Sequence, residues 1–200
     1  MVKFDDPEYW DGNTGYRPPG YADFTVNTLK EICIMLFNPQ SVLDVGCACG
    51  FGVHRLRRLG YNAVGLDISK FMLNKAESGI KPYLILGTAW SLPFRDKQFG
   101  LVFSSGVLEH IPETKLNAAV SEMVRVGRAG LIGVSCLDDV TTSTEDIDTT
   151  HEMIKMRADW QALFPPSFIV ISDSEASWRL FATTGIQMLM TTPPNKITLP

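Results

Sequence analysis

The chain has 200 residues, of which 45% are hydrophobic, enough for one domain with a sizeable core. Its formal net charge is −4, and a dedicated nucleic-acid-binding protein would instead be basic. No apolar stretch approaches the roughly 20 residues of a membrane span, and the first residues lack the apolar region of a signal peptide. The four cysteines lack zinc-site spacing and are interpreted as reduced thiols, so we expect a cytoplasmic protein without a membrane or nucleic-acid partner.

The N-terminal part combines an aromatic segment with one helix. Residues 1–22 are rich in aromatic and turn-forming residues, and little regular structure is expected there. Between residues 22 and 37 the apolar positions repeat at helical spacing, and Asn38-Pro39 ends this helix.

From residue 41 onward, apolar runs typical of buried strands alternate with helical patterns. Strands are predicted at 41–45, 62–67, 83–87, 99–104 and 130–136. Helices are predicted at 52–59, 70–78 and 112–126, the second with Ser69 as its N-cap. This alternation predicts an α/β fold with a doubly wound parallel sheet and helices on both faces.

The C-terminal part is less regular. Residues 137–150 are rich in Asp, Ser and Thr, and form either a loop over the strand ends or a solvated connector. A helix is predicted at 151–164 and a strand at 168–171. Residues 178–182 and 187–191 are predicted as two strands or as one long hairpin arm.

The most informative stretch is Val42–Gly52, where a buried strand leads into a glycine-rich turn and then a helix. Asp44 precedes the first glycine, Gly46, and Asp67 ends the next strand. This order binds adenosine-type ligands, because glycines let the backbone turn tightly and approach the ligand. The second carboxylate can accept hydrogen bonds from both ribose hydroxyls.

The position of Asp44 separates two classes of ligand. In a dinucleotide-binding loop the pyrophosphate lies at the helix N-terminus, where this carboxylate would repel it. The acid suits a ligand with a positive end, such as the ammonium and sulfonium groups of S-adenosylmethionine. A nicotinamide-dependent oxidoreductase is therefore disfavoured, both by Asp44 and by the segment Leu92-Pro93-Phe94.

Four segments, in order, resemble the motifs of class I S-adenosylmethionine-dependent methyltransferases: Val42–Gly52, Gly65–Ser69, Gly87–Phe94 and Phe99–Ile111. The resemblance covers about residues 40–136, and implies a Rossmann-like, seven-stranded, mostly parallel sheet with an antiparallel final strand. It divides a single domain, 1–200, into three parts. These are an N-terminal lid and helix (1–37), a cofactor-binding core (40–136) and an acceptor-side part (137–200).

The resemblance also implies which residues contact the cofactor. The methionine end would be lined by Asp44, Gly46, Ala48, Gly50, Ser104 and Ser105. The ribose and adenine would contact Asp67, Ile68, Thr88 and Ala89. The two serines have a second interpretation, in which they only make strand-end hydrogen bonds. Tyr21, with Tyr16, either folds over the cofactor or covers the edge of the sheet.

Three residues depart from the family pattern. Ala48 replaces the middle glycine, Thr88 replaces an acid, and Gly100 replaces an acid after Phe99. Together they predict weaker cofactor affinity. They also keep a second hypothesis open, in which the chain is a weakly active or inactive binding protein that retains the fold.

The predicted acceptor is a small molecule, such as a saccharide or another metabolite with a hydroxyl. Amino-methylating enzymes that act on nucleic-acid bases carry an Asn/Asp-Pro-Pro-aromatic loop, whereas this chain has Ser104-Ser105-Gly106-Val107. Residues 148–151, followed by Trp160, resemble a segment of small-molecule methyltransferases.

Two histidines are candidates for catalysis. His151 either takes a proton from the acceptor hydroxyl or bonds to the preceding loop. His110 is either catalytic or a structural hydrogen-bonding residue. Transfer from a sulfonium needs no metal, and we expect none. The product would be S-adenosylhomocysteine.

Overall fold

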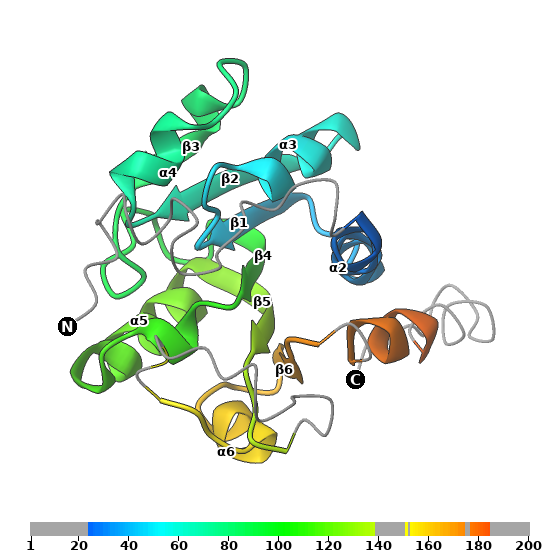
Figure 1. Cartoon of the computed structure of the whole chain (residues 1–200), viewed down its shortest axis with the longest axis vertical. Coiled ribbons are helices and arrows are strands. Elements are labelled where there is room, and N and C mark those ends of the chain that lie inside the picture. The colour runs from blue at the N-terminus through cyan, green and yellow to red at the C-terminus, as the bar shows by residue number, and fades with distance from the viewer. Residues whose placement is uncertain (1–23, 139–150, 152, 175–176, 185–200) are drawn as a thin grey trace.

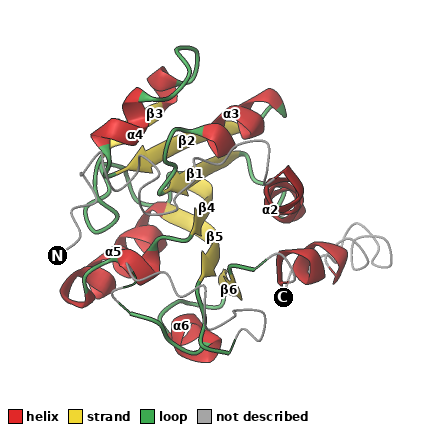
Figure 2. Ribbon diagram, in the orientation of Figure 1, coloured by secondary structure: helices red, strands yellow, loops and turns green. Residues whose placement is uncertain are grey.

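A six-stranded sheet forms the centre of the computed structural model (Figures 1 and 2), which describes residues 24–138, 151, 153–174 and 177–184. The strands are β1 (Ser41–Val45), β2 (Asn62–Asp67), β3 (Leu84–Leu86), β4 (Phe99–Ser105), β5 (Gly127–Val134) and β6 (Phe168–Ser172). Their order is β3-β2-β1-β4-β5-β6, and every neighbouring pair is parallel. The strand order therefore reverses between β1 and β4, where doubly wound sheets bind ligands at the carboxyl ends of the strands.

Helices cover both faces of this sheet (Figure 1). They are α2 (Phe24–Leu36), α3 (Phe51–Arg58), α4 (Lys70–Asn74), α5 (Glu113–Val126) and α6 (Arg157–Ala162), with 3-10 turns η2 (Lys81–Tyr83) and η3 (Leu108–His110). Residues 177–184 form a further helix, which carries no label. None of the helices in the described part combines the length and the apolar character that a membrane span requires.

Alternate residues of each central strand supply two separate cores, because successive side chains of a strand point to opposite faces. Leu43 and Val102 pack with the buried side of α5 and with Trp160 of α6. On the other face, Leu101 packs with residues of α2 and α3 and with Trp178. The strands of the reversal point are thus held from both sides, which fixes their carboxyl ends.

The fold class predicted from the sequence is confirmed: a Rossmann-like α/β sheet with helices on both faces. Strands β1 and β2 have the predicted bounds, and the others begin or end within three residues of them. Ser69 caps α4 as predicted, accepting a hydrogen bond from the Met72 N–H at 3.2 Å. Six strands are present among the described residues, all parallel, so the seventh, antiparallel strand is not confirmed.

In the C-terminal part, one predicted element is of the wrong type and another begins later than predicted. Residues 178–182 are helical, because Trp178, Phe181 and Ala182 are spaced to pack one helical face against the sheet. The helix predicted from residue 151 begins only at Arg157. Before it, Lys155 forms a parallel bridge with Cys136 beyond the end of β5, and the Leu137 N–H donates to the Lys155 carbonyl. The other predicted strand, 187–191, lies outside the described residues.

Gly65 sets how closely α3 and the glycine turn approach β2. A Cβ atom there would lie 2.6 Å from Cys47 Sγ and 2.9 Å from Val53 Cγ2. We expect Gly65→Ala to lower the free energy of unfolding by about 1–3 kcal/mol through overpacking, measured by urea denaturation. Gly79→Ala is the control, since its Cβ would meet nothing within 4 Å. Equal stability of Gly65→Ala and wild type would contradict this account.

Candidate cofactor and acceptor site

The glycine turn at the carboxyl end of β1 has a backbone that few side chains tolerate. Gly46, Ala48 and Gly50 have φ angles of 82°, 48° and 76°, all in the left-handed region. A Cβ at Gly46 would also lie 2.2 Å from Val107 Cγ2. The turn therefore needs glycine at Gly46 and Gly50, and Ala48 is the one position where this chain accepts backbone strain in the turn.

Asp67, at the carboxyl end of β2, holds this turn in place. Its Oδ2 accepts a hydrogen bond from the Ala48 N–H at 2.7 Å, and its Oδ1 accepts one from the Ser69 N–H at 2.8 Å. A carboxylate has about four acceptor positions. Asp67 can therefore support the turn and still accept hydrogen bonds from a ligand.

Asp44 lies beside Asp67 at the edge of the sheet and is buried. Burial, together with the charge of Asp67, raises the pKa of Asp44 to about 7, and the charge of Lys30 opposes this rise. The positive charge of Lys30 therefore does not fully offset the unfavourable burial of the ionised Asp44 carboxylate. A ligand that brings positive charge next to it would be favoured.

A second polar group joins three distant segments at the same edge. Lys30 Nζ of α2 lies 3.2 Å from Asp173 Oδ1 and donates to Ser105 Oγ at 2.7 Å. Asp173 also accepts hydrogen bonds from Ser105 Oγ at 2.7 Å and from Trp178 Nε1 at 2.6 Å. Although burial acts to raise it, the pKa of Asp173 is held below its usual range by Lys30 and these donors.

Both serines predicted to flank the methionine moiety are engaged within the protein. Ser104 is fully buried and donates to the Val45 carbonyl at 3.1 Å, while Ser105 bridges Lys30 and Asp173. These are strand-end hydrogen bonds, the second of the two interpretations given above. Contact of either serine with a cofactor stays a prediction.

The residues predicted to contact adenine gather at the ends of β2 and β3. Ile68 follows β2 and is half-buried. Thr88 and Ala89 come after β3, where the Gly87 N–H donates to the Asp67 carbonyl at 2.9 Å. Ala89 is buried in the core. Tyr16 and Tyr21 lie outside the described residues.

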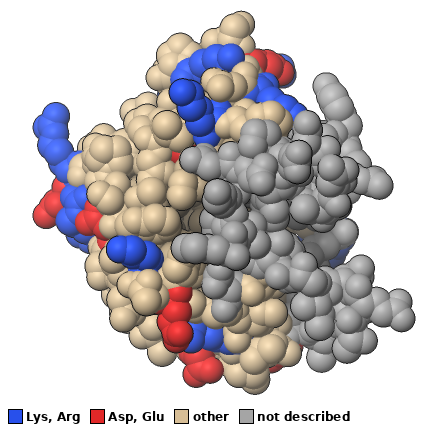
Figure 3. All heavy atoms as spheres, turned by 60° about the vertical axis from the view of Figure 1, so that its left-hand side comes forward, with Lys and Arg blue, Asp and Glu red and all other residues tan. Residues whose placement is uncertain are grey.

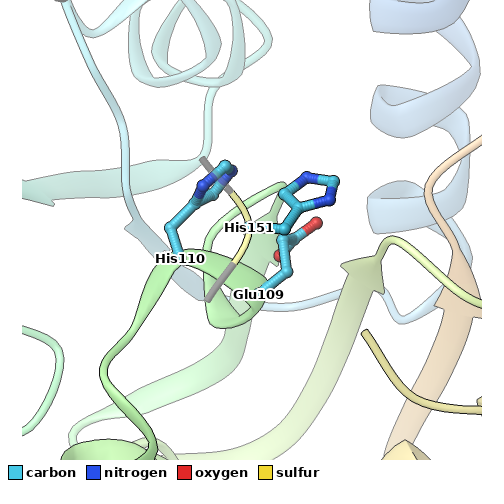
Figure 4. A group of neighbouring side chains, drawn as sticks. All are labelled: Glu109, His110 and His151. Atoms are coloured by element: carbon cyan, nitrogen blue, oxygen red, sulfur yellow. The ribbon is translucent and has the colours of Figure 1, made fainter. Parts of the chain in front are cut away.

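Beyond the carboxyl ends of β4 and β5, Glu109 and His110 of η3 meet His151 (Figure 4). The two imidazole rings have centroids 4.9 Å apart. Glu109 is 1% exposed and its Oε1 accepts from the Ser135 N–H at 2.9 Å. Burial raises the pKa of Glu109, and the charge of His110 opposes this.

The structure thus brings the predicted residues into two neighbouring groups, one around Asp44 and Asp67 and one around the two histidines. Sequence analysis missed Lys30, Glu109 and Asp173. For the two acids there was a signal, since both follow the carboxyl end of a parallel strand, where ligands bind. Lys30 had none, because only folding brings α2 to this edge.

Comparison with known proteins agrees with this geometry. Residues 43–132 match the family model described as "Methyltransferase domain". A malonyl-[acyl-carrier protein] O-methyltransferase of Buchnera aphidicola is 35% identical over 58% of this chain and 49% of its own length. A ubiquinone biosynthesis O-methyltransferase of Shewanella pealeana is 30% identical, over 60% and 53%. The chain spans about half the length of these curated relatives.

Among solved structures, the PH0226 protein of Pyrococcus horikoshii OT3 superposes with a TM-score of 0.50 at 28% identity, covering 60% of this chain and 61% of that one. The doubly wound sheet, with a glycine turn and two acids at its reversal point, agrees with the match of residues 43–132 to a methyltransferase domain. Residues 43–132 are similar to the methyltransferase domains of the class I S-adenosylmethionine-dependent family.

The strain at Ala48 can be measured directly. A left-handed conformation costs a non-glycine residue roughly 1–2 kcal/mol, partly offset by the greater chain entropy of glycine when unfolded. We therefore expect Ala48→Gly to raise the free energy of unfolding by about 1 kcal/mol, measured by urea denaturation.

Ala118→Gly, on the exposed side of α5, is the matched control. It has ordinary helical geometry, so the same substitution should lower stability by about 1 kcal/mol. A loss of stability in both variants would show that the turn does not strain Ala48.

Proposed function

We propose that this chain binds S-adenosylmethionine and transfers its methyl group to an oxygen of a small-molecule acceptor, such as a saccharide or other metabolite hydroxyl, releasing S-adenosylhomocysteine. The observation that carries the proposal is the meeting of Asp44, Asp67 and the turn at residues 46–50 at the reversal point of the sheet. The O-methyltransferase relatives support an oxygen acceptor.

Each half of the cofactor has a matching group. Asp67 would accept hydrogen bonds from the ribose hydroxyls, while Ile68 and Thr88 border the adenine. Asp44 would face the ammonium and sulfonium end, where positive charge compensates its buried carboxylate. Gly46 and Gly50 give the methionine part access to the backbone, because neither position has room for a side chain.

The reaction itself is an in-line displacement. The acceptor oxygen attacks the methyl carbon, the carbon–sulfur bond breaks with its electrons going to sulfur, and the hydroxyl proton is lost. Alignment and exclusion of water are the main contributions of such a protein. We propose that His110 and His151 lie on the acceptor side and promote loss of that proton. Among the described residues they are half-buried at the edge of the strands that would hold the cofactor.

The acceptor is further constrained by surface charge. On the described part of the face shown in Figure 3, Lys and Arg lie beside Asp and Glu and among uncharged residues, and do not form one continuous basic surface there. A phosphate backbone requires such a basic surface. The distribution supports a small molecule over a nucleic acid.

A binding protein without turnover is the second candidate, and the departures from the family pattern motivate it. Gly100 does not support the binding-protein hypothesis as strongly as Ala48 and Thr88 do. It lies near the amino end of β4, where its N–H donates to Ser41 Oγ at 3.1 Å, so it is at the edge of the sheet opposite the site. Ala48 and Thr88 remain at the site, and both bear on affinity rather than on the transfer step.

Calorimetric titration with S-adenosylmethionine, S-adenosylhomocysteine and NAD tests the cofactor. We expect micromolar binding of the first two. Asp67→Asn should weaken it about 10- to 100-fold, because a hydrogen bond to a charged group is worth about 1.5–3 kcal/mol. Asp96→Asn is the control, since that exposed carboxylate pairs with Arg125 away from the site. Binding of NAD alone would overturn the proposal, and cofactor binding without transfer to a broad acceptor panel would favour the binding protein.

The buried Asp44 gives the binding a pH signature. Its pKa of about 7 means that much of the unliganded protein is protonated there at pH 6. A positively charged ligand lowers that pKa, so binding should release up to about one proton at pH 6. Calorimetry in two buffers of different ionisation enthalpy measures this release.

Asp44→Asn is the control for the proton release, because its amide does not titrate. This variant should release no proton at pH 6, and its affinity should be lower because the carboxylate is gone. The raised pKa of Asp44 also affects the free energy of unfolding. The unliganded folded protein holds this proton more tightly than the unfolded chain, so the stabilisation is present at low pH and is lost as pH rises through about 7. Equal binding enthalpies of wild type in both buffers would contradict a contact between Asp44 and the positive end of the ligand.

A further inference from the structure

Glu109, His110 and His151 form a cluster with the composition of a metal site (Figure 4). One potential ligand atom from each residue lies within 4.8 Å of the other two. A backbone hydrogen bond joins the segment of Glu109 and His110 to the segment that follows His151: the Met153 N–H donates to the Glu109 carbonyl at 3.2 Å. The cluster is thus held together by the fold around it.

One atom of the cluster requires an explanation. Glu109 Oε2 is buried and has no hydrogen-bond partner among the described residues, while Oε1 is bound by the Ser135 N–H. A buried carboxylate oxygen without a donor is unfavourable, and buried charges in proteins are normally paired or coordinate metals. The charge of Asp173 also acts on Glu109, which makes the surroundings more favourable for a cation.

We propose that Glu109, His110 and His151 bind a divalent transition-metal cation such as Zn²⁺. Two imidazoles and one carboxylate suit Zn²⁺ and Co²⁺, whereas Mg²⁺ and Ca²⁺ prefer oxygen ligands alone. Bonds of about 2.0–2.2 Å to one ion require the three ligand atoms, which lie within 4.8 Å of one another, to move closer together when the ion binds. Three protein ligands leave a coordination position open, as in catalytic rather than structural zinc sites.

The cation site deepens the proposed function and rests on it for its role, though not for binding. An acceptor hydroxyl at the open position would lose its proton to water more readily, because a bound cation lowers the pKa of its ligand. The resulting oxyanion attacks the methyl carbon, and the electrons of the carbon–sulfur bond remain on sulfur. His151 is then a metal ligand and not the base.

Cobalt titration of the full chain, freed of metals by a chelator and carrying no histidine tag, tests the site without any cofactor. We expect one equivalent of Co²⁺ to bind, with visible d–d absorption that Zn²⁺ abolishes by displacement. A strong thiolate charge-transfer band would instead place Co²⁺ on cysteine and overturn the proposal. Absence of Co²⁺ binding would overturn it as well.

Single-residue variants identify the ligands. We expect His110→Ala and His151→Ala each to weaken Co²⁺ binding at least about tenfold, with thermal unfolding used to check that both remain folded. His54→Ala is the matched control, because His54 is a half-exposed histidine on α3 that faces Glu77 at 3.5 Å. Unchanged Co²⁺ affinity in both cluster variants would overturn the assignment.

Failure of this inference can be told from failure of the proposed function. Binding of S-adenosylmethionine by calorimetry reports on Asp44 and Asp67 and needs no metal. If the chain binds Co²⁺ through the cluster but neither sulfur ligand, the cation site stands and the proposed function fails. If methyl transfer proceeds at the same rate after chelation, the catalytic role of the cation is overturned, and loss of that rate in His151→Ala would identify His151 as the base.

Discussion

The two hydrogen bonds accepted by the Asp67 carboxylate are the constraint on which the rest of the site depends. One oxygen binds the N–H of Ala48 in the turn, and the other binds the N–H of Ser69 before α4. The turn has left-handed residues at alternate positions, a conformation that local preferences alone do not maintain. This side chain, together with the Leu66 carbonyl that accepts from the Gly46 N–H at 2.8 Å, therefore fixes the backbone that the cofactor would approach.

Much of the fold could be predicted because buried parallel strands appear in the sequence as continuous apolar runs. The strand predicted at residues 178–182 was wrong because a short apolar run fits a strand or a helix face equally well. Only the packing of Trp178 against the sheet selects the helix. In the site, Asp44 and Asp67 could be predicted from their spacing. Lys30 and Asp173 could not be paired in advance, since their contact depends on how distant segments dock.

Acidic side chains dominate the carboxyl edge of the described sheet, and this gives the site its chemical character. Asp44, Asp67 and Glu109 are all buried there, and Lys30 compensates chiefly Asp173. Such an arrangement favours ligands that carry positive charge over phosphates. A sulfonium cofactor and a divalent cation, as proposed above, would each satisfy this electrostatic demand.

The contacts of Asp173 also determine when the site can exist during synthesis. Lys30, Ser105 and Trp178 all bind this carboxylate, and the pair of Lys30 and Asp173 spans most of the described chain. While the C-terminal part that carries Asp173 and Trp178 is still inside the ribosome, the contacts that link Lys30 of α2 to Ser105 of β4 through Asp173 cannot form. Since contacts this distant in sequence form late and slowly, we expect the group of Lys30, Ser105 and Asp173 to assemble after the glycine turn.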